Sequence, residues 1–407
     1  ALATAKHFAG DGGTAWGSST TPGYSIDQGV VPDMDEEAFR ALHLAPYEAA
    51  VGAGVRTVMA SFSSTGDGKV HGDRHLLTEV LVGDLGFTGF VVSDWAGIDQ
   101  IDPDYETAVA KAISAGIDMA MVPSDGPRFQ AAVKAGLERG AITQERIDEA
   151  VRRILGVKFE MGLFEQPMPQ QADAELGSDA HRAIAREAAG KSAVLLKTTP
   201  GALPLPSGDV LLAGSGADDI GLQSGGWTIT WQGSPGPITP GTTIADDLRE
   251  RMGDRLIYTG ARAIPEGTHA KTGIVVVAEP PYAEGVGDSA TLALPEADLA
   301  TIEAVRPMVD DLVVVILSGR PVMLDRILPT ADVVVAAWLP GTEGAGVGDV
   351  LFGARPFTAT TPYTWPATPD DAPRTGKEPC DGAVFPLGYG LDASGALLGP
   401  AACASTR

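Results

Sequence analysis

Residues 89–95 read Gly-Phe-Val-Val-Ser-Asp-Trp, an apolar strand that delivers a carboxylate and then an indole at its carboxyl end. Three other apolar runs in the first part of the chain are also followed by amphipathic stretches. One of these runs ends near Lys6-His7-Phe8, and the other two cover residues 55–62 and 116–121. Apolar strands that alternate with helical patterns are typical of βα units in a parallel sheet. The first part of the chain therefore predicts four βα units.

Helix signals lie between these strands. The helix from about residue 35 is predicted to begin after Asp33, with Glu36 as the partner in a capping box. A second helix is predicted over residues 73–85, and a third from Thr143, where apolar residues recur with helical spacing. Strands and helices thus alternate along this part of the chain.

A polar, Pro-bearing stretch over residues 166–173 separates this part from a second block. The strands predicted in the second block cover residues 209–215, 255–260, 273–278, 311–318 and 332–338. Their runs of Val, Ile and Leu are nearly continuous, which is typical of strands that are covered on both faces. The second block therefore predicts a doubly wound sheet with helices on either side.

The charge of the chain limits the kinds of molecule that it can bind. The 407 residues include 29 Lys and Arg against 53 Asp and Glu, a formal net charge of −24. Such a charge repels phosphate backbones and anionic lipid surfaces, so we expect neither nucleic acid nor a membrane as a partner. No apolar run approaches the ~18 residues needed to cross a bilayer. The length predicts a folded protein of two or three domains.

Cysteine and metal-ligand patterns point away from a cofactor. Cys380 and Cys403 are the only cysteines in the sequence, so neither a zinc cluster nor a disulfide-rich fold is available, although the two could form one bridge in the tail. No His, Cys or Asp cluster has metal-ligand spacing. We therefore expect the protein to need no cofactor.

Three polar side chains follow the predicted strands at the edge where βα barrels keep their chemistry. They are Lys6, His7 and Asp94. Other roles are open for each of them. An Asp at a strand end is often a helix cap, and adjacent residues on a strand point to opposite faces, so either Lys6 or His7 could be a structural residue.

Taken in order, the motifs of this chain resemble glycoside hydrolase family 3. The segments that carry the resemblance are residues 6–8, 59–63, 93–95, 116–119, 225–233, 279–284, 318–321, 337–341 and 388–391. The segment Trp227-Thr228-Ile229-Thr230-Trp231 is most similar to the exo-acting β-glucan glucohydrolases of that family.

The resemblance implies two catalytic carboxylates. Asp94 matches the nucleophile that forms a glycosyl-enzyme intermediate, and Glu284 matches the acid/base on a loop after the strand over residues 273–278. Glu279 is the alternative for the acid/base. A retaining reaction of this kind places the two carboxyl groups about 5–5.5 Å apart.

The resemblance also implies the residues that bind the sugar: Lys6, His7, Trp95, Trp231, Met59 and Met121. Lys6 and His7 match residues that bind hydroxyls of the sugar being released. The two tryptophans match a pair that sandwiches the next glucose, and a flat indole clamp tolerates several β-linkages. The methionines would line the pocket, although methionines near strand ends are also typical of a core.

The implied fold class is α/β, with a partial (β/α)8 barrel, second half only, followed by a doubly wound α/β sandwich. Residues 1–165 form the C-terminal half of the barrel domain, 166–180 a linker, 181–375 the sandwich domain, and 376–407 a tail that packs back on the domains. We expect the rest of a full-length chain to supply the missing half-barrel, and these 407 residues alone to be poorly active or inactive.

The expected function is that of a retaining exo-acting β-glucosidase or β-glucan glucohydrolase that releases glucose from β-linked gluco-oligosaccharides. The alternatives are a β-xylosidase of the same family and a catalytically inactive carbohydrate-binding fragment. The β-N-acetylglucosaminidases of the family carry an Asp-x-His pair in the loop after Lys-His-Phe, and residues 11–20 contain no His. Because polymeric substrates lie outside cells, we expect a periplasmic or extracellular location.

Overall fold

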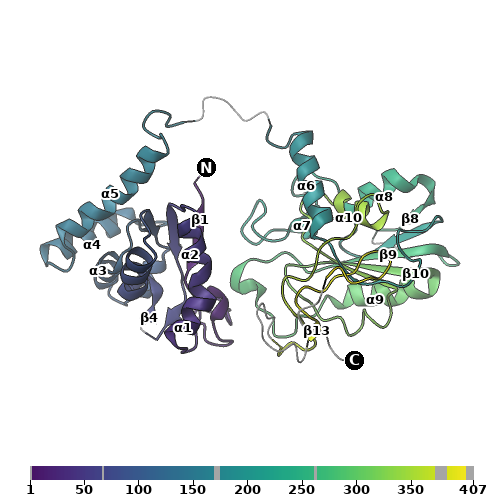
Figure 1. Cartoon of the computed structure of the whole chain (residues 1–407), viewed down its shortest axis with the longest axis horizontal. Coiled ribbons are helices and arrows are strands. Elements are labelled where there is room, and N and C mark those ends of the chain that lie inside the picture. The colour runs from purple at the N-terminus through teal and green to yellow at the C-terminus, as the bar shows by residue number, and fades with distance from the viewer. Residues whose placement is uncertain (1, 67, 169–174, 261–263, 372–382, 400–407) are drawn as a thin grey trace. The chain divides into compact units, whose positions relative to one another are not determined.

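The computed structural model describes residues 2–66, 68–168, 175–260, 264–371 and 383–399. The chain divides into two compact units (Figure 1). The first unit contains residues 1–172 together with the short segment Glu284–Asp288, and the second contains residues 173–283 and 289–407. Cys380 and Cys403, for which a bridge was considered, lie outside the described residues.

The first unit is built on a parallel three-stranded sheet in the order β1-β2-β5, formed by Thr4–Phe8, Thr57–Ala60 and Phe90–Val92. The strand predicted over residues 116–121 is wrong, since a single parallel bridge joins Val92 to Met119. The reason is local. The N–H of Met121 donates to the side-chain oxygen of Ser93 at 2.7 Å and not to a backbone carbonyl, so the ladder does not continue. Two short strands, β3 (Ser64–Thr65) and β4 (Gly68–Lys69), form a separate hairpin.

Helices follow the strands of this sheet. They are α1 (Glu36–Phe39), a π-helical turn (Arg40–Leu44), α2 (Ala45–Gly52), a π-helical segment (His75–Asp84), α3 (Tyr105–Ala115), α4 (Gly126–Glu138) and α5 (Gln144–Glu160). Thr143 caps α5 as predicted, because its side chain accepts from the N–H of Arg146. The predicted capping box after Asp33 is wrong. Asp35 is the cap, and its carboxylate accepts from the N–H of Ala38 at 2.8 Å.

The second unit contains a six-stranded sheet in the order β6-β11-β10-β9-β7-β8. The strands are Val194–Lys197 (β6), Val210–Ala213 (β7), Leu256–Tyr258 (β8), Ala270–Ala278 (β9), Val309–Leu317 (β10) and Val333–Trp338 (β11). The last five confirm the five predicted strands and run parallel to one another. Strand β6 pairs antiparallel with β11. It was not predicted from the sequence, because its apolar residues follow almost directly on the helix before it.

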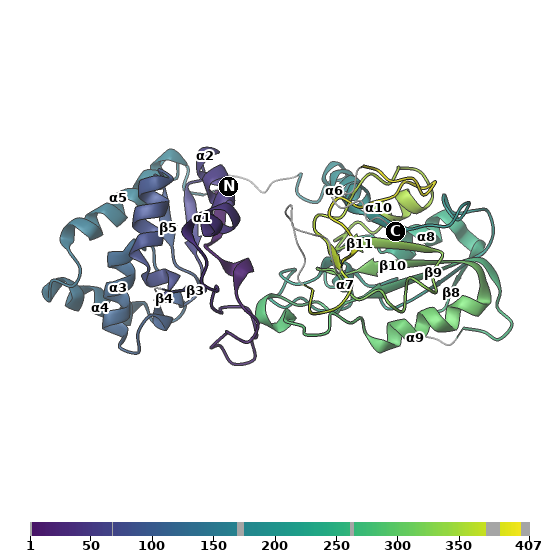
Figure 2. The same ribbon diagram turned by 60° about the horizontal axis from the view of Figure 1, so that its bottom comes forward.

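Helices cover both faces of this sheet (Figures 1 and 2). One face carries α6 (Asp179–Ser192), α8 (Ile244–Met252) and α10 (Ala345–Leu351), and the other carries α9 (Glu296–Val305). Side chains alternate along β10: Val313 packs with α8 and α10, whereas Val314 packs with α9. This two-sided burial explains why the strands read as continuous apolar runs.

Other described elements of the second unit are short. They include α7 (Ile220–Ser224) and the two-stranded pair β12 (Trp365–Pro366) and β13 (Ala383–Phe385). The indole N–H of Trp365 donates to the carbonyl of Val322 at 2.8 Å, which ties this pair to the core of the second unit.

An ion network ties the three helices on one face of the second unit together. Arg186 of α6 makes two hydrogen bonds to the carboxylate of Asp349 in α10, at 2.7 and 2.6 Å. Arg251 of α8 bonds the same Asp349 at 2.6 Å and the buried Asp247 of its own helix at 2.7 Å. The forked geometry matches the planar guanidinium, so the network fixes the mutual register of α6, α8 and α10.

Candidate active site

Asp94 lies two residues beyond the end of β5, with its side chain only 16% exposed. One carboxylate oxygen, Oδ1, accepts from the N–H of Trp95 at 2.7 Å. The other, Oδ2, lies 3.2 Å from Nε2 of His7, which stands near the end of β1. Both oxygens therefore have partners, and the carboxylate is held at the carboxyl edge of the sheet, where parallel strands bring their terminal residues together.

The other ring nitrogen of His7 faces a second carboxylate. Nδ1 of His7 lies 2.6 Å from Oδ2 of Asp11. Burial works against the charged imidazolium, but the hydrogen bond and charge of Asp11, with the charge of Asp94, outweigh it and raise the pKa of His7. Both ring nitrogens of His7 therefore face a carboxylate oxygen, an arrangement that favours the protonated imidazole.

His71 fixes the backbone of Asp94 through a hydrogen bond. Its Nε2 accepts from the N–H of Asp94 at 2.9 Å, and the side chain is fully buried. Burial lowers the pKa of His71 to about 4, so the ring is neutral and able to accept at neutral pH. His71 was not predicted as a site residue, because it lies outside the predicted strand ends and outside the segments that carry the family resemblance.

The other predicted residues of the first unit lie around the same edge. Lys6 is exposed, next to the half-buried His7, so neither residue is a core residue. Met59 lies on β2 opposite Val92 in the sheet register, and Met59 and Met121 are both partly exposed. The indole of Trp95 is 64% exposed, which leaves a large apolar plate in solvent directly after Asp94.

Trp231 lies in the second unit, on the loop over residues 225–233. It is 47% exposed, and its ring centroid lies 6.4 Å from that of Trp227. The N–H of Trp227 donates to the carbonyl of Trp231 at 2.8 Å, and Trp227 and Ile229 have φ angles of 58° and 64°. Non-glycine residues rarely adopt such angles, so this loop holds its two indoles in a strained, closed turn.

Glu279 and Glu284 occupy different environments. Glu279 is 7% exposed and is bound by Arg320 and by the hydroxyl of Tyr282 at 3.0 Å. Glu284 is exposed, begins a 3₁₀ turn over Glu284–Gly287 and has a φ angle of 54°. Glu279 is therefore held in a buried ion pair, and Glu284 is the more accessible of the two carboxylates.

Glu284 and Asp94 belong to the same compact unit, because the segment Glu284–Asp288 groups with the first unit. Within that unit, the carboxylate of Asp27 accepts from the N–H of Gly285 at 2.9 Å. The carboxylate of Asp288 accepts from the N–H of Ser25 at 2.6 Å. Hydrogen bonds to Asp27 and Ser25 thus hold both ends of the turn that carries Glu284.

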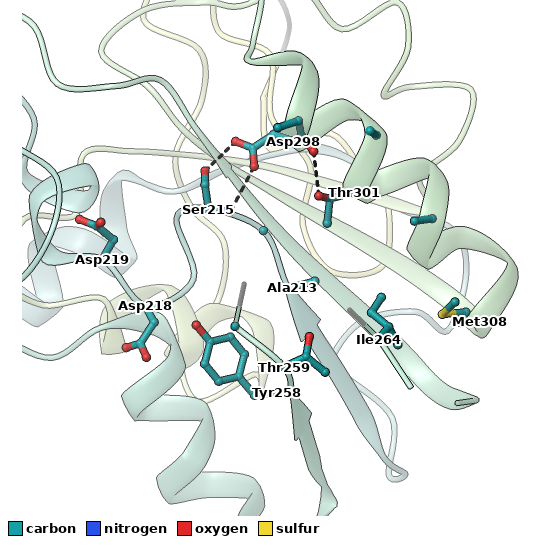
Figure 3. Close-up of a pocket in the computed structure, with 15 residues that line it drawn as sticks. Ala213, Ser215, Asp218, Asp219, Tyr258, Thr259, Ile264, Asp298, Thr301 and Met308 are labelled. Atoms are coloured by element: carbon teal, nitrogen blue, oxygen red, sulfur yellow. Dashed lines mark hydrogen bonds between the residues drawn. The ribbon is translucent and has the colours of Figure 1, made fainter. Parts of the chain in front are cut away.

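A cavity of about 710 Å³ lies elsewhere, in the second unit between α9 and the ends of β7 and β8 (Figure 3). Its carboxylates already have internal partners. Asp298 accepts from Ser215, Asp219 accepts from the N–H of Gly236, and Asp218 pairs with Arg249. The predicted site residues do not line this cavity.

The structure brings together His7 and Asp94, and it adds Asp11 and His71 beside them, which sequence reasoning missed. In the second unit it pairs Trp227 with Trp231. A signal for Asp11 was present, since it stands four residues after His7 in the Gly-rich turn. In the described part of the chain there is no group of three or more His, Cys, Asp or Glu side chains suited to a metal ion. None of the helices described there is long and apolar enough to span a membrane.

Two family models match the chain: the glycosyl hydrolase family 3 N terminal domain over residues 1–157 and the glycosyl hydrolase family 3 C-terminal domain over residues 193–393. The matches cover both compact units and the motifs that predicted the family. The chain belongs to glycoside hydrolase family 3.

Relatives agree with this assignment. The chain is 30% identical to lysosomal beta glucosidase of Dictyostelium discoideum, over 95% of this chain and 50% of that protein. It is 27% identical to periplasmic beta-glucosidase of Salmonella typhimurium, over 96% of this chain and 58% of that protein. A mutant of exo-1,3/1,4-beta-glucanase from a Pseudoalteromonas species has a crystal structure that is 37% identical, with a TM-score of 0.87 over 100% of this chain and 67% of that chain. The chain spans about half the length of the curated relatives it matches.

Proposed function

We propose that the protein is a retaining, exo-acting β-glucosidase that releases glucose from β-linked gluco-oligosaccharides. The observation that carries the proposal is the carboxylate of Asp94, held by the N–H of Trp95 and by His7 at the carboxyl edge of a parallel sheet. A carboxylate in a fixed orientation, with an exposed indole beside it, suits attack on a sugar ring.

In the proposed reaction Asp94 attacks the anomeric carbon, and the bond between that carbon and the glycosidic oxygen breaks. Glu284 gives its proton to the departing oxygen. Water then enters, Glu284 takes a proton from it, and the glycosyl ester with Asp94 is hydrolysed. The two inversions at one carbon retain the configuration.

The sugar-binding residues have complementary chemistry in this proposal. Lys6 donates hydrogen bonds to hydroxyls of the glucose being released, and His7, whose two ring nitrogens face Asp11 and Asp94, contacts the same sugar with its ring. Trp95 and Trp231 offer flat apolar plates to the C–H faces of the next glucose, and Met59 and Met121 lie at the rim. Both indoles are exposed, so each can offer its face to a sugar in this role.

The proposal extends to the fold and to the location of the protein. The parallel sheet β1-β2-β5 is proposed as part of the second half of a (β/α)8 barrel, with the domain boundaries at residues 165 and 181 predicted above. A periplasmic or extracellular location fits polymeric substrates, and the Salmonella relative is named as periplasmic.

The test follows the anomer first formed from a β-linked substrate, by proton NMR on the protein expressed from its whole gene. The β-anomer of glucose should appear first, and an initial α-anomer would contradict retention. Asp94→Asn should lower kcat/KM by more than about 10³-fold, because the nucleophile is lost. The control is Asp84→Asn, which removes an exposed carboxylate paired with Arg40 and should leave kcat/KM unchanged.

Laminaribiose, cellobiose and xylobiose separate the proposal from its alternatives. Glucose release from the first two with little xylose from the third supports a β-glucosidase. Preferential cleavage of xylobiose would identify a β-xylosidase, and binding of all three without products would identify a carbohydrate-binding protein.

A further inference from the structure

Asp11 has no role in the reaction as proposed above, yet its carboxylate pairs with His7, the side chain that contacts Asp94. It opens a 3₁₀ turn over Asp11–Gly13, directly after the tight turn at Gly10, where φ is 104°. This geometry turns its carboxylate back toward His7, four residues earlier, and the two side chains meet at 2.6 Å.

The second oxygen of Asp11 is held by two serines of the segment that follows β2. Oδ1 accepts from the hydroxyl of Ser61 and, at 3.3 Å, from that of Ser63. Both serines are buried, and the N–H of Ser63 donates to the hydroxyl oxygen of Ser61 at 2.9 Å. This last bond fixes the hydroxyl of Ser61 as a donor toward Asp11. Burial acts to raise the pKa of Asp11, but the hydrogen bonds from His7 and Ser61 and the charge of His7 lower it, so the carboxylate stays ionised.

The result is a continuous chain of hydrogen-bonding groups from the segment after β2 to Asp94: Ser61, Asp11, His7 and Asp94. An imidazole that donates from Nδ1 to a fixed carboxylate can donate from Nε2 only when it is protonated. Asp11 therefore controls two properties of His7 at once, the direction of its ring and its charge. The same logic governs carboxylate–imidazole pairs in general, where the carboxylate fixes the orientation of the ring.

We propose that Asp11 is a positioning residue that holds His7 as a charged double donor aimed at Asp94. This inference rests on the proposed function for its effect on catalysis, but its structural content, the orientation and charge of His7, does not. The charged groups that face His7 are Asp11, Asp94 and, with the opposite effect, Lys6; His71 adds a weaker neutral neighbour.

The first experiment measures the pKa of His7 by NMR in the whole protein, with isotope-labelled histidine; the chain has six histidines, and His7→Gln assigns the signal. In Asp11→Asn the amide keeps the size of the side chain but loses the charge. The pKa of His7 should then fall below its value in the unmodified protein. Asp84→Asn should leave it unchanged. An unaltered His7 pKa in Asp11→Asn would overturn the inference, whether or not the protein is a glycosidase.

The second experiment compares kinetics. Asp11→Asn should lower kcat/KM by about 10- to 100-fold, the range of one hydrogen bond to a charged group. The protonated form of His7 exists below its pKa, so the alkaline limb of kcat/KM should move to lower pH. A fall in rate with an unmoved pH profile would mean a merely structural role and would overturn the inference. If the product of the whole gene is inactive before any substitution, the proposed function is refuted and the NMR result alone decides the inference.

Ser61→Ala keeps the inference testable if Asp11→Asn folds poorly. This variant leaves Asp11 in place and removes one donor to its Oδ1. Asp11 is then less firmly oriented but keeps its charge, so kcat/KM should fall by less than in Asp11→Asn, while the pKa of His7 should stay above its value in Asp11→Asn. An unchanged kcat/KM, or a His7 pKa as low as in Asp11→Asn, would contradict the chain of contacts.

Discussion

The guanidinium of Arg320 donates two hydrogen bonds to one carboxylate oxygen of Glu279, from Nε at 3.0 Å and from Nη2 at 2.7 Å. The residues are 41 positions apart, at the ends of the neighbouring strands β9 and β10. Tyr282 binds the other oxygen of Glu279, and Arg320 also lies over the Tyr282 ring at 4.6 Å. This cluster anchors the start of the loop that leads to Glu284.

Arg320→Met should destabilise the protein by about 3 kcal/mol, because it leaves the buried carboxylate of Glu279 without its guanidinium. Urea denaturation gives the free energy of unfolding. The double variant with Glu279→Gln is the control and should recover part of the loss, since it removes the uncompensated charge. A single variant as stable as the unmodified protein would show that the pair contributes little.

Glu284→Gln should separate substrates by their leaving groups. An aryl glucoside with a good leaving group needs no proton from an acid, so its turnover should fall by less than about tenfold, whereas cellobiose turnover should fall by about 10³-fold. Glu279→Gln should lower the melting temperature and affect both substrates alike. If Glu279→Gln produced the split and Glu284→Gln did not, the two roles would have to be exchanged.

Asp349→Asn should weaken the second unit in a pH-dependent way. The hydrogen bond from Arg186 has the largest effect and lowers the pKa of Asp349. Burial acts to raise this pKa, but the hydrogen bond from Arg251 also lowers it, so the net shift is downward. A carboxyl group with a lowered pKa stabilises the folded state above its unfolded pKa of about 3.9, and this stabilisation disappears as the pH falls through the folded pKa. The variant should therefore lose about 2–4 kcal/mol near pH 7, and the difference should shrink below about pH 4.

Calorimetry between pH 3 and 7 measures this difference. The control is Glu296→Gln, which removes an exposed partner of Arg326 and should leave the melting temperature nearly unchanged. A gap between Asp349→Asn and the unmodified protein that stayed constant down to pH 3 would argue against a native-state ion network.

Two glycine substitutions should act in opposite directions. Gly156 lies inside α5 with open space around the position of an added Cβ, so Gly156→Ala should stabilise the protein by about 0.5–1 kcal/mol. Gly214 has a φ of 97°, and a Cβ there would overlap the carbonyl of Val276 on the neighbouring strand. Gly214→Ala should destabilise the protein by about 2 kcal/mol or more. Thermal unfolding checks both, and equal shifts for the two would contradict the local geometry.

Much of the fold follows from patterns between near neighbours in the chain. The Val- and Leu-rich runs that form β7 to β11 are legible because burial on both faces requires apolar residues at every position. The cap of α5 at Thr143 is equally local. Asp35 replaced Asp33 as the cap of α1 because two acids in one turn offer the same chemistry, and only the backbone angle of the cap distinguishes them.

The sequence by itself determined the family, most of the strands, and Asp94 and His7 as neighbours at one sheet edge. Only the tertiary structure decided that Asp11 and Ser61 stand behind His7 and that Glu279 belongs to Arg320. Apolar periodicity and helix caps depend on residues that lie only a few positions apart in the sequence. The partner of a charged side chain depends on which strands lie side by side, and that order is set by the packing of the whole unit.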